Sequence, residues 1–240
     1  VINLELILAD MESVDKRIAR VAKMAKQKDK DAMIEEPILL KLKEVLEAEK
    51  PARAADLSDD EKKVIKGLHL LTIKPMLYVA NVSEDEVADP SENKYVKMVQ
   101  EYAAAEGAQV IVVCAKIEEE ISELEDEEKK EFLAELGIAE SGLDQLIKAS
   151  YSLLGLATYF TAGVQEVRAW TFRKGMKAPQ CAGIIHSDFE RGFIRAETVA
   201  FDDLVEYGSK PAAKEAGRVR SEGKEYVVQD GDVMEFLFNV

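Results

Sequence analysis

The first 50 residues place apolar side chains at the period of an α-helix. Apolar positions recur at alternating spacings of three and four, which is the seam of a coiled coil: Leu4, Ile7, Met11, Val14, Ile18, Val21 and Ala25. The polar run 26–31 ends this pattern, and a second helical pattern follows with Ile38, Leu42 and Leu46 on one face. Pro37 is tolerated only near the start of that second helix. The spacing predicts an antiparallel helical hairpin over residues 3–50.

Two compact apolar runs follow the hairpin. Ser58 and Glu61 form a capping-box signature, which predicts a short helix ending near Lys66. Residues 75–80 and 110–113 are apolar without alternation, as in strands that are buried on both faces of a parallel sheet. A helical segment over about residues 92–106 lies between them, so the order predicts a βαβ unit. Acidic helices are expected from there to about residue 154.

From residue 158 the pattern changes to short strands. Residues 159–161 and 167–172 predict a β-hairpin around Ala162 and Gly163. A small mixed sheet with one main helix is a β-grasp arrangement, and its remaining elements are expected as a helix over about 180–190 and strands at 193–201, 226–228 and 234–238. The chain is therefore predicted to have three parts: residues 1–66, 67–156 and 157–240.

Composition narrows the class of protein. The chain has 240 residues, 47% of them hydrophobic and 33% charged, and no run approaches the ~18–20 apolar residues of a membrane span. Cys114 and Cys181 lie 67 positions apart, which excludes a disulfide framework or a Cys-rich zinc site and suits a reducing cytoplasm. The chain begins at Val1, without Met and inside a helical pattern, so we expect a fragment of a longer protein.

Charge is unevenly distributed along the chain. The net charge of −15 argues against indiscriminate coating of nucleic acid, but residues 75–156 carry 19 acidic and 6 basic side chains, a net −13. Asp29 is the one acidic residue between positions 16 and 30. The basic residues of that segment are candidates for a contact with RNA, the alternative being a solvated coiled-coil surface: Lys16, Arg17, Arg20, Lys23, Lys26, Lys28 and Lys30.

Polar or small residues follow each predicted buried strand. Asn81-Val82-Ser83-Glu84 follows the first strand and Cys114-Ala115-Lys116 the second. Ligands bind beyond the carboxyl ends of strands in open parallel sheets, and GTPase-type sheets place their base-reading residues on these two loops. Most GTPases have Asn-Lys-x-Asp here, and the Asp accepts two hydrogen bonds from guanine. Val82 replaces that Lys and the longer Glu84 replaces that Asp, so a purine bound here is predicted to be adenine; alone, Asn-x-x-Glu is a weak signal.

The remaining chemical groups favour structural roles. We expect His186 to be a structural or surface residue rather than a catalytic base, His69 to be packed, and Cys114 to be a packed, inert thiol rather than a redox switch. The acidic segment 118–131 has no converging spacing and is expected to be a solvated helical face. We therefore predict neither a catalytic residue nor a metal ligand in this chain.

Longer segments carry a more specific signal, and their order runs through essentially the whole chain: residues 2–10, 74–75, 81–84, 159–163, 166–171, 182–196 and 230–240. In content and order these segments closely resemble the YchF family, the Obg-like ATPases. The resemblance implies an α/β and α+β multidomain fold. Its parts would be a partial Ras-like P-loop nucleotide domain, an antiparallel coiled-coil helical insertion and a C-terminal TGS domain of β-grasp fold.

The resemblance also implies a function. Family members are cytoplasmic, associate with the ribosome and hydrolyse ATP in preference to GTP, with Mg²⁺ as cofactor. By position, Asn81 and Glu84 would be the base-specificity pair, Val82 would lie along the purine, and Cys114, Ala115 and Lys116 would form the supporting loop.

The phosphate-binding motif of that family does not occur in this sequence. No Gly-x-x-x-x-Gly-Lys-Ser/Thr string is present, and the switch regions and the metal-binding Asp-x-x-Gly are also missing. We therefore expect that this chain alone does not hydrolyse ATP and binds neither ATP nor Mg²⁺ firmly. The expected partners of the parent protein are ATP and the ribosome or ribosomal RNA, without a membrane or sequence-specific DNA. The alternative is a non-catalytic RNA- or ribosome-binding module.

Overall fold

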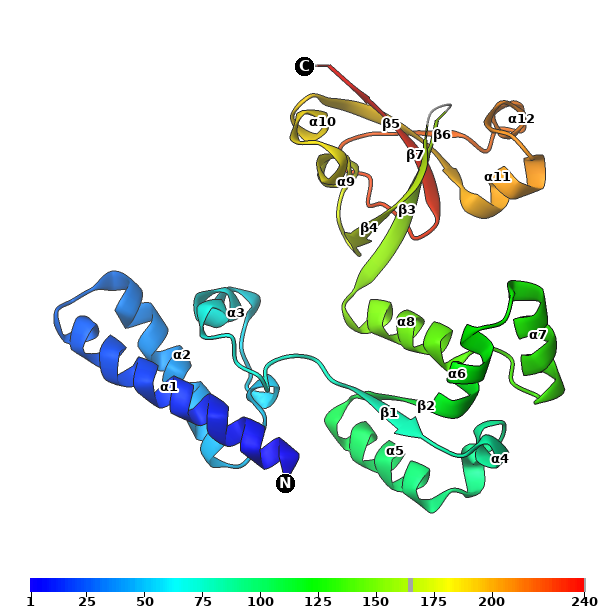
Figure 1. Ribbon diagram of the computed structural model, residues 1–240. Helices are drawn as coiled ribbons and strands as arrows, with labels where there is room; N and C mark the ends of the chain where they lie inside the picture. Colours follow the sequence, from blue (N-terminus) through cyan, green and yellow to red (C-terminus); the bar gives the residue numbers. More distant parts are fainter. Residues whose placement is uncertain (164–165, 240) are drawn as a thin grey trace. The chain divides into compact units, whose positions relative to one another are not determined.

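The computed structural model describes residues 1–163 and 166–239 (Figure 1). These residues form two compact units, Val1–Met76 and Leu77–Val240, and each unit is described by itself.

The first unit begins with a helical hairpin, as predicted. Helices α1 (Ile2–Lys26) and α2 (Lys30–Glu47) pack along each other (Figure 1). The Asp29 side chain accepts a hydrogen bond of 2.9 Å from the Ala32 N–H and so fixes the start of α2. Leu4 is exposed, so the buried seam begins at Ile7 and not at Leu4, where the spacing predicts its start. The core between the helices is fully buried: Ile7, Val14, Val21, Ile38, Leu39, Leu42 and Leu46.

Pro37 lies inside α2 rather than near its start. The helix begins at Lys30 because Asp29 caps it there, so Pro37 falls more than one turn inside. Proline has no N–H to donate to the carbonyl of residue i−4, here Met33, and its ring crowds that carbonyl. The helix nevertheless continues to Glu47, held by the buried face that it shares with α1.

Short elements complete the first unit: η1 (Ala52–Ala54), α3 (Asp59–Ile65) and η2 (Lys66–Leu68). The predicted capping box of Ser58 and Glu61 is present at the start of α3. His69 is exposed, in contrast to the packed position predicted for it. Its φ of 50° lies in the left-handed region, and the residue ends η2 there.

A buried carboxylate joins α1 to the end of this unit. Asp10 is 2% exposed, and its oxygens accept hydrogen bonds from the Leu71 N–H (2.7 Å), the Thr72 N–H (2.7 Å) and the Thr72 hydroxyl (2.6 Å). Three donors satisfy a carboxylate that would otherwise be costly to bury.

The second unit opens with the predicted βαβ unit. Strands β1 (Leu77–Asn81) and β2 (Gln109–Val113) are parallel, with Asn81 opposite Val113, and helix α5 (Lys94–Glu106) connects them after two short turns, α4 (Glu84–Val87) and η3 (Pro90–Glu92).

The prediction that β1 and β2 are each buried on both faces is wrong for this chain, because no residue of either strand is fully buried. Val79 is 48% exposed. Among the described residues β1 pairs with β2 alone, and a sheet of two strands is too narrow to be covered fully on both faces.

Three helices follow, in agreement with the predicted acidic segment: α6 (Ala115–Ser122), α7 (Asp126–Glu135) and α8 (Gly142–Leu153). Their buried side chains include Ile117, Ile121 and Leu133. The Glu118 carboxylate accepts hydrogen bonds from the N–H groups of Gly142 (2.6 Å) and Leu143 (3.1 Å), so an acidic side chain of α6 caps the first turn of α8.

The last part of the chain contains a mixed five-stranded sheet in the order β4-β3-β7-β5-β6. The predicted hairpin is present, with β3 and β4 antiparallel, and β3 also pairs with β7 in parallel. Helix α9 (Ala178–Ile185) covers one face, where Tyr159, Phe172, Cys181 and Met234 are buried. Strand β3 spans Leu156–Ala162, β4 spans Val167–Arg173, β5 spans Phe193–Ala200, β6 spans Arg220–Glu222 and β7 spans Asp232–Phe238.

Several predictions for this part are wrong. The helix expected over 180–190 is split at His186, whose backbone is extended and whose Nδ1 accepts from the Asp188 N–H (3.2 Å) to cap α10 (Ser187–Arg191). Residues 226–228 form no strand, only the single bridge Lys177–Val227. Three elements were not predicted at all: α11 (Phe201–Tyr207), α12 (Lys210–Glu215) and β6.

Within the described residues, none of the helices combines the length and the apolar character that crossing a membrane requires.

Candidate functional site

The two predicted loops begin side by side at one edge of the parallel pair β1–β2. Asn81 and Val113 are register partners, and the Val82 N–H donates to the Val113 carbonyl at 2.9 Å. The loops after both strands therefore leave the sheet together, as expected for carboxyl ends of parallel strands (Figure 1).

The side chain of Asn81 joins these loops. Its Oδ1 accepts a hydrogen bond of 2.9 Å from the N–H of Ala115, the first residue of α6. A first-turn N–H has no partner within its own helix, so Asn81 supplies the missing acceptor. No described residue accepts a hydrogen bond from the Nδ2 amide of Asn81, which leaves this donor open at the surface.

A second link between the loops is ionic. The Nζ of Lys116 lies 2.6 Å from Oε1 of Glu84, and Glu120 lies 3.9 Å from the same ammonium. The hydrogen bond from Lys116 to Glu84 raises the pKa of the lysine above its usual value. The bond engages Oε1, and Oε2 of Glu84 has no partner among the residues that the structure describes.

A capping network that was not predicted from the sequence holds the first loop. The Ser83 hydroxyl donates to Glu86 Oε2 at 2.8 Å, and Asn93 Nδ2 donates to Glu86 Oε1 at 2.9 Å. The hydrogen bond from Ser83 lowers the pKa of Glu86. The signal that could have found this turn is Ser-x-x-Glu, the same spacing that identified Ser58 and Glu61.

A cavity of about 520 Å³ opens beside the first loop. Such a volume lies within the range of small-molecule sites. Its wall combines apolar side chains with a few polar groups, as such sites do: Ala80, Asn81, Val82, Ser83, Glu86, Asn93, Tyr95, Val96 and Val99. Asn81 and Val82 thus line a hollow, whereas Glu84 and Lys116 are not among its lining residues.

Cys114, which follows β2, belongs to the buried core next to the site. It is 3% exposed, precedes α6 and packs in one core cluster with Ile117 and Ile121. The predicted packed position is therefore confirmed. Ala115 and Lys116, the next two residues, are exposed at the surface.

The predicted basic segment lies on the hairpin of the first unit. Lys16, Arg20, Lys23 and Lys26 follow one another at helical spacings along the outer face of α1, and all four are exposed. Lys16 pairs with Glu12 at 2.5 Å. Lys28 and Lys30 are exposed in and after the turn.

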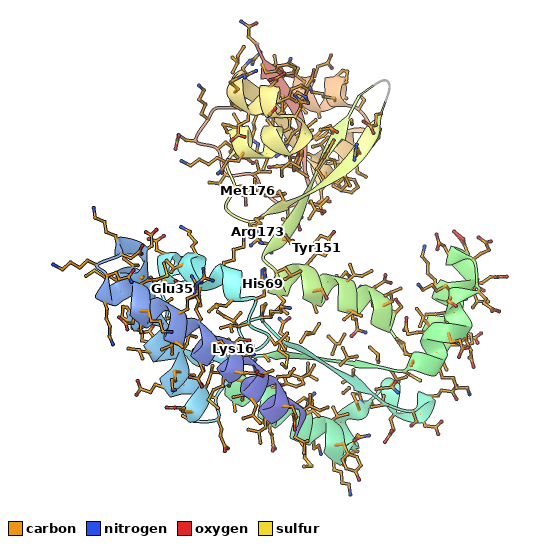
Figure 2. The ribbon with its side chains drawn as sticks, turned by 60° about the vertical axis from the view of Figure 1, so that its left-hand side comes forward. Lys16, Glu35, His69, Tyr151, Arg173 and Met176 are labelled. Atoms are coloured by element: carbon orange, nitrogen blue, oxygen red, sulfur yellow. The ribbon has the colours of Figure 1, made fainter. Side chains whose placement is uncertain are left out.

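Arg17 differs from the other six basic residues. Its Nε and Nη2 each donate at 2.7 Å to one carboxylate oxygen of the buried Glu35, the residue labelled in Figure 2, so Arg17 forms a bidentate pair between α1 and α2. The hydrogen bond with Glu35 raises the pKa of Arg17. Arg17 therefore links α1 to α2, and its guanidinium is already engaged by Glu35.

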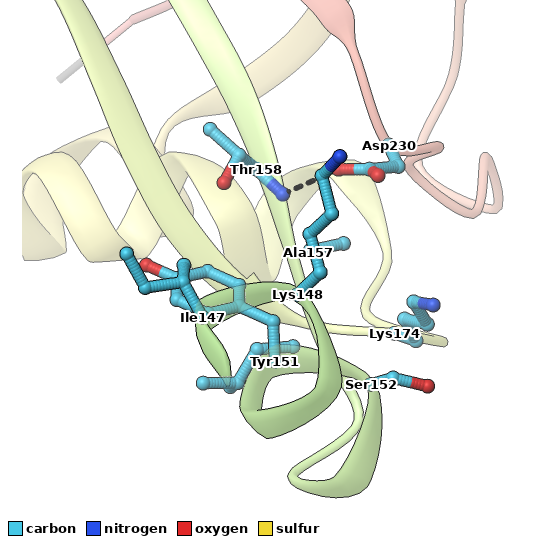
Figure 3. A pocket seen from close by; sticks show the side chains of 9 residues that line it. Ile147, Lys148, Tyr151, Ser152, Ala157, Thr158, Lys174 and Asp230 are labelled. Carbon is cyan, nitrogen blue, oxygen red and sulfur yellow. Dashed lines mark hydrogen bonds between the residues drawn. The ribbon is translucent and has the colours of Figure 1, made fainter. Parts of the chain in front are cut away.

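A second cavity, of about 540 Å³, lies where α8 leads into β3 (Figure 3). Lys148, Tyr151, Lys174 and Asp230 are among its lining residues, and the Thr158 N–H donates to Asp230 Oδ1 at 2.8 Å. None of the predicted site residues lines this cavity.

Comparisons with known proteins agree with the geometry. Residues 156–239 match the family model YchF-GTPase_C, described as a protein of unknown function (DUF933). The chain is 74% identical over 239 residues to the ribosome-binding ATPase YchF of Bacillus subtilis (strain 168), and 54% identical over 240 residues to that of Escherichia coli O157:H7. Each match covers 100% of this chain and 65% of the relative, so the chain spans about two thirds of their length.

The fold agrees as well. The structure of the Schizosaccharomyces pombe YchF GTPase superposes with a TM-score of 0.83 at 34% identity, covering 98% of this chain and 64% of that one. High identity along the whole chain, the match of its last part and the shared α/β architecture lead to one conclusion: this chain belongs to the YchF family.

Proposed function

We propose that this chain is part of a cytoplasmic, ribosome-associated ATPase that binds and hydrolyses ATP in preference to GTP. The relatives described above are named ribosome-binding ATPases, and they are longer than this chain. In this proposal the chain supplies the adenine-reading loop, the helical hairpin and the C-terminal domain of the parent protein.

The observation that carries the proposal is the hydrogen bond between Asn81 Oδ1 and the Ala115 N–H. Because Oδ1 is used in this bond, the amide Nδ2 of Asn81 is presented as a donor. Every purine offers N7 as an acceptor on one edge, so this donor suits adenine and guanine equally. Asn81 would therefore recognise a purine without choosing between the two.

The choice between adenine and guanine falls to Glu84. Its Oε2 is an acceptor without a partner in the described structure, and the exocyclic amine of adenine is a donor. Guanine carries an acceptor, O6, at the corresponding position and is repelled by a carboxylate. Val82 supplies an apolar contact for the face of the ring. Cys114, Ala115 and Lys116 would hold the second loop in place.

The phosphate chemistry belongs elsewhere in the parent protein. The sequence of this chain contains no P-loop string, which would supply the phosphate cradle, its lysine and the hydroxyl ligand of Mg²⁺. We therefore propose that the chain alone does not hydrolyse ATP and holds neither ATP nor Mg²⁺ firmly.

The same proposal assigns three domains. Residues 1–66 would be the coiled-coil insertion, residues 67–156 the C-terminal part of the Ras-like nucleotide domain, and residues 157–240 a TGS domain. The strand order β4-β3-β7-β5-β6, with β3 and β7 parallel at the centre, supports a β-grasp fold for the last of these.

The direct test is nucleotide binding by the full-length protein carrying Asn81→Ala. We expect both ATP and GTP to bind about tenfold more weakly. The substitution removes the neutral hydrogen bond from Asn81 to the base, and it also removes the hydrogen bond from the Ala115 N–H that joins the two loops. Asn239→Ala, an exposed residue near the chain end, serves as the matched control. Unchanged ATP affinity would remove the base-reading role of Asn81.

A second candidate function is a non-catalytic RNA- or ribosome-binding module. It is favoured by the exposed cations of α1 and the turn, of which Arg20, Lys23, Lys26, Lys28 and Lys30 have no ion-pair partner among the described residues. Co-sedimentation with ribosomes at two salt concentrations tests it, since phosphate contacts weaken as salt rises. Charge reversal at Arg20, Lys23 and Lys26 with undiminished pelleting would exclude this surface.

A further inference from the structure

The outer face of α2 carries a row of apolar side chains that nothing in the described structure covers. Met33 is 57% exposed, Ile34 56% and Leu40 51%, and Pro37 between them is exposed as well. Met33, Pro37 and Leu40 follow the three-and-four spacing of a helix seam. This seam lies opposite the face of α2 that packs on α1, which is formed by Leu39, Leu42 and Leu46.

The fold of the hairpin does not account for this row. The three large side chains remain more than half exposed, so they contribute little burial to the core. Pro37 removes one backbone hydrogen bond from the helix interior, which destabilises an ordinary helix. These residues instead provide an exposed apolar surface on α2.

The two outer faces of the hairpin have different chemistry. The outer face of α1 bears Lys16, Arg20, Lys23 and Lys26, whereas the outer face of α2 bears the apolar row. Helices α1 and α2 lie along each other (Figure 1) and pack through their inner faces, so these two surfaces point away from each other. Cations suit phosphate, but methyl and methylene groups gain nothing from it.

The charged residues at the two ends of the apolar row indicate which charges a partner should carry. Extending the same seam by one step in each direction gives Lys30 at one end and Glu44 at the other, both exposed and without an ion-pair partner in the described chain. A helix laid along this seam would need apolar residues at its centre, an acidic side chain opposite Lys30 and a basic one opposite Glu44. This distance of 14 residues corresponds to about 21 Å of helix.

We propose that the outer face of α2 docks an amphipathic helix of a ribosomal protein, with an acidic side chain at the Lys30 end. The proposal rests on the proposed association with the ribosome and adds a protein contact to the phosphate contact of α1. Four side chains are too few for a stable complex alone, which buries about 800 Å² per partner. Two weak contacts on one hairpin reinforce each other, because the second forms within a complex that the first has already made.

The test is co-sedimentation of the full-length protein with purified ribosomes and, separately, with protein-free ribosomal RNA. The outer-face variant combines Met33→Gln, Ile34→Gln and Leu40→Gln, which keep helix propensity and remove the apolar surface. Its control combines Ile194→Gln and Val205→Gln, two exposed apolar residues of the C-terminal part. Circular dichroism and thermal unfolding establish that both variants are folded.

We expect the outer-face variant to bind ribosomes about tenfold more weakly than wild type, equivalent to about 1.4 kcal/mol, and to bind protein-free RNA unchanged. The loss should persist at high salt, since apolar contacts are not screened. Equal binding of variant and wild type to ribosomes overturns the proposal, and so does an equal loss on protein-free RNA. If wild type itself does not pellet with ribosomes, the proposed association fails, and this proposal fails with it.

A photo-reactive residue in place of Ile34 identifies the occupant. A crosslinked product that resists ribonuclease, is removed by protease and maps to an amphipathic helix with an acidic end supports the proposal. A product that ribonuclease removes assigns the face to RNA and overturns it, as does a protein crosslink to a segment that is not helical.

Discussion

The ammonium of Lys116 lies 2.6 Å from the carboxylate of Glu84, and this contact joins the loops that follow the two parallel strands. Both side chains are largely exposed, so water screens the pair and its contribution to stability is small. The effect of the ion pair is to fix the position of the Glu84 carboxylate. One oxygen of Glu84 is held by the lysine, and the orientation of the other is thereby restricted.

Lys116→Met should reduce the proposed preference of the full-length protein for ATP over GTP while leaving the unfolding temperature nearly unchanged. Without Lys116, Glu84 can rotate away from the base and the carboxylate no longer discriminates between the purines. Competition binding of ATP and GTP measures the ratio of affinities, which we expect to fall by about threefold to tenfold. Lys224→Met, an exposed lysine of the C-terminal part, is the control. A ratio that stays at the wild-type value would show that Lys116 does not position Glu84.

Asp10→Asn should destabilise the first unit by about 2 kcal/mol. The amide has nearly the shape of the carboxylate, but it turns one acceptor into a donor that faces the N–H groups of Leu71 and Thr72. Urea unfolding followed by circular dichroism measures the loss. Asp15→Asn, at an exposed carboxylate of the same helix, should cost much less. Equal effects of the two substitutions would mean that the buried hydrogen bonds of Asp10 are dispensable.

Elements with a strong periodic pattern were predictable from the sequence. The seam from Ile7 to Val21 gave the hairpin, and the run 110–113 gave the second strand of the parallel pair. In the hairpin the pattern reflects burial of one continuous helix face, which a sequence records well, whereas the residues of the second strand are only half-buried or exposed. The placement of Asn81 beside Ala115 also followed, since parallel strands bring their carboxyl ends to one edge.

Elements held by tertiary contacts were not predictable in the same way. Strand β6 consists of Arg220, Ser221 and Glu222, which carry no apolar alternation, and it exists because β5 offers an open edge. Residues 226–228 are apolar for a different reason. Val228 fills the core from a loop, and the Tyr226 hydroxyl donates to the buried Asp232 at 2.7 Å. Helix α12 did have a local signal, Ser209 as cap with Pro211 in the first turn.

Gly142→Ala should destabilise the second unit by about 1–3 kcal/mol, although alanine is the better helix former. A Cβ at this position would lie 2.7 Å from Cγ1 and 2.9 Å from Cβ of Val113, so α8 would have to move away from β2. That movement would also stretch the hydrogen bond of 2.6 Å from the Gly142 N–H to Glu118. Thermal unfolding measures the change, with Gly223→Ala as the control because no atom lies within 4 Å of its added Cβ. A stabilised Gly142→Ala protein would contradict the close packing of α8 on β2.

Acid should selectively weaken the attachment of α3 to α2. The hydrogen bond from Lys41, followed by those from the Ser58 backbone and hydroxyl, lowers the pKa of Glu61 from 4.5 to about 2. The folded protein therefore binds this proton less readily than the unfolded chain, and the stabilisation is complete above about pH 4.5 and lost as the pH falls towards 2. Unfolding of wild type and Glu61→Gln between pH 6 and pH 2 tests the sign: the wild-type advantage should shrink as the solution is acidified. An advantage of wild type over Glu61→Gln that is the same at every pH would mean that the ionised carboxylate of Glu61 is not what holds α3.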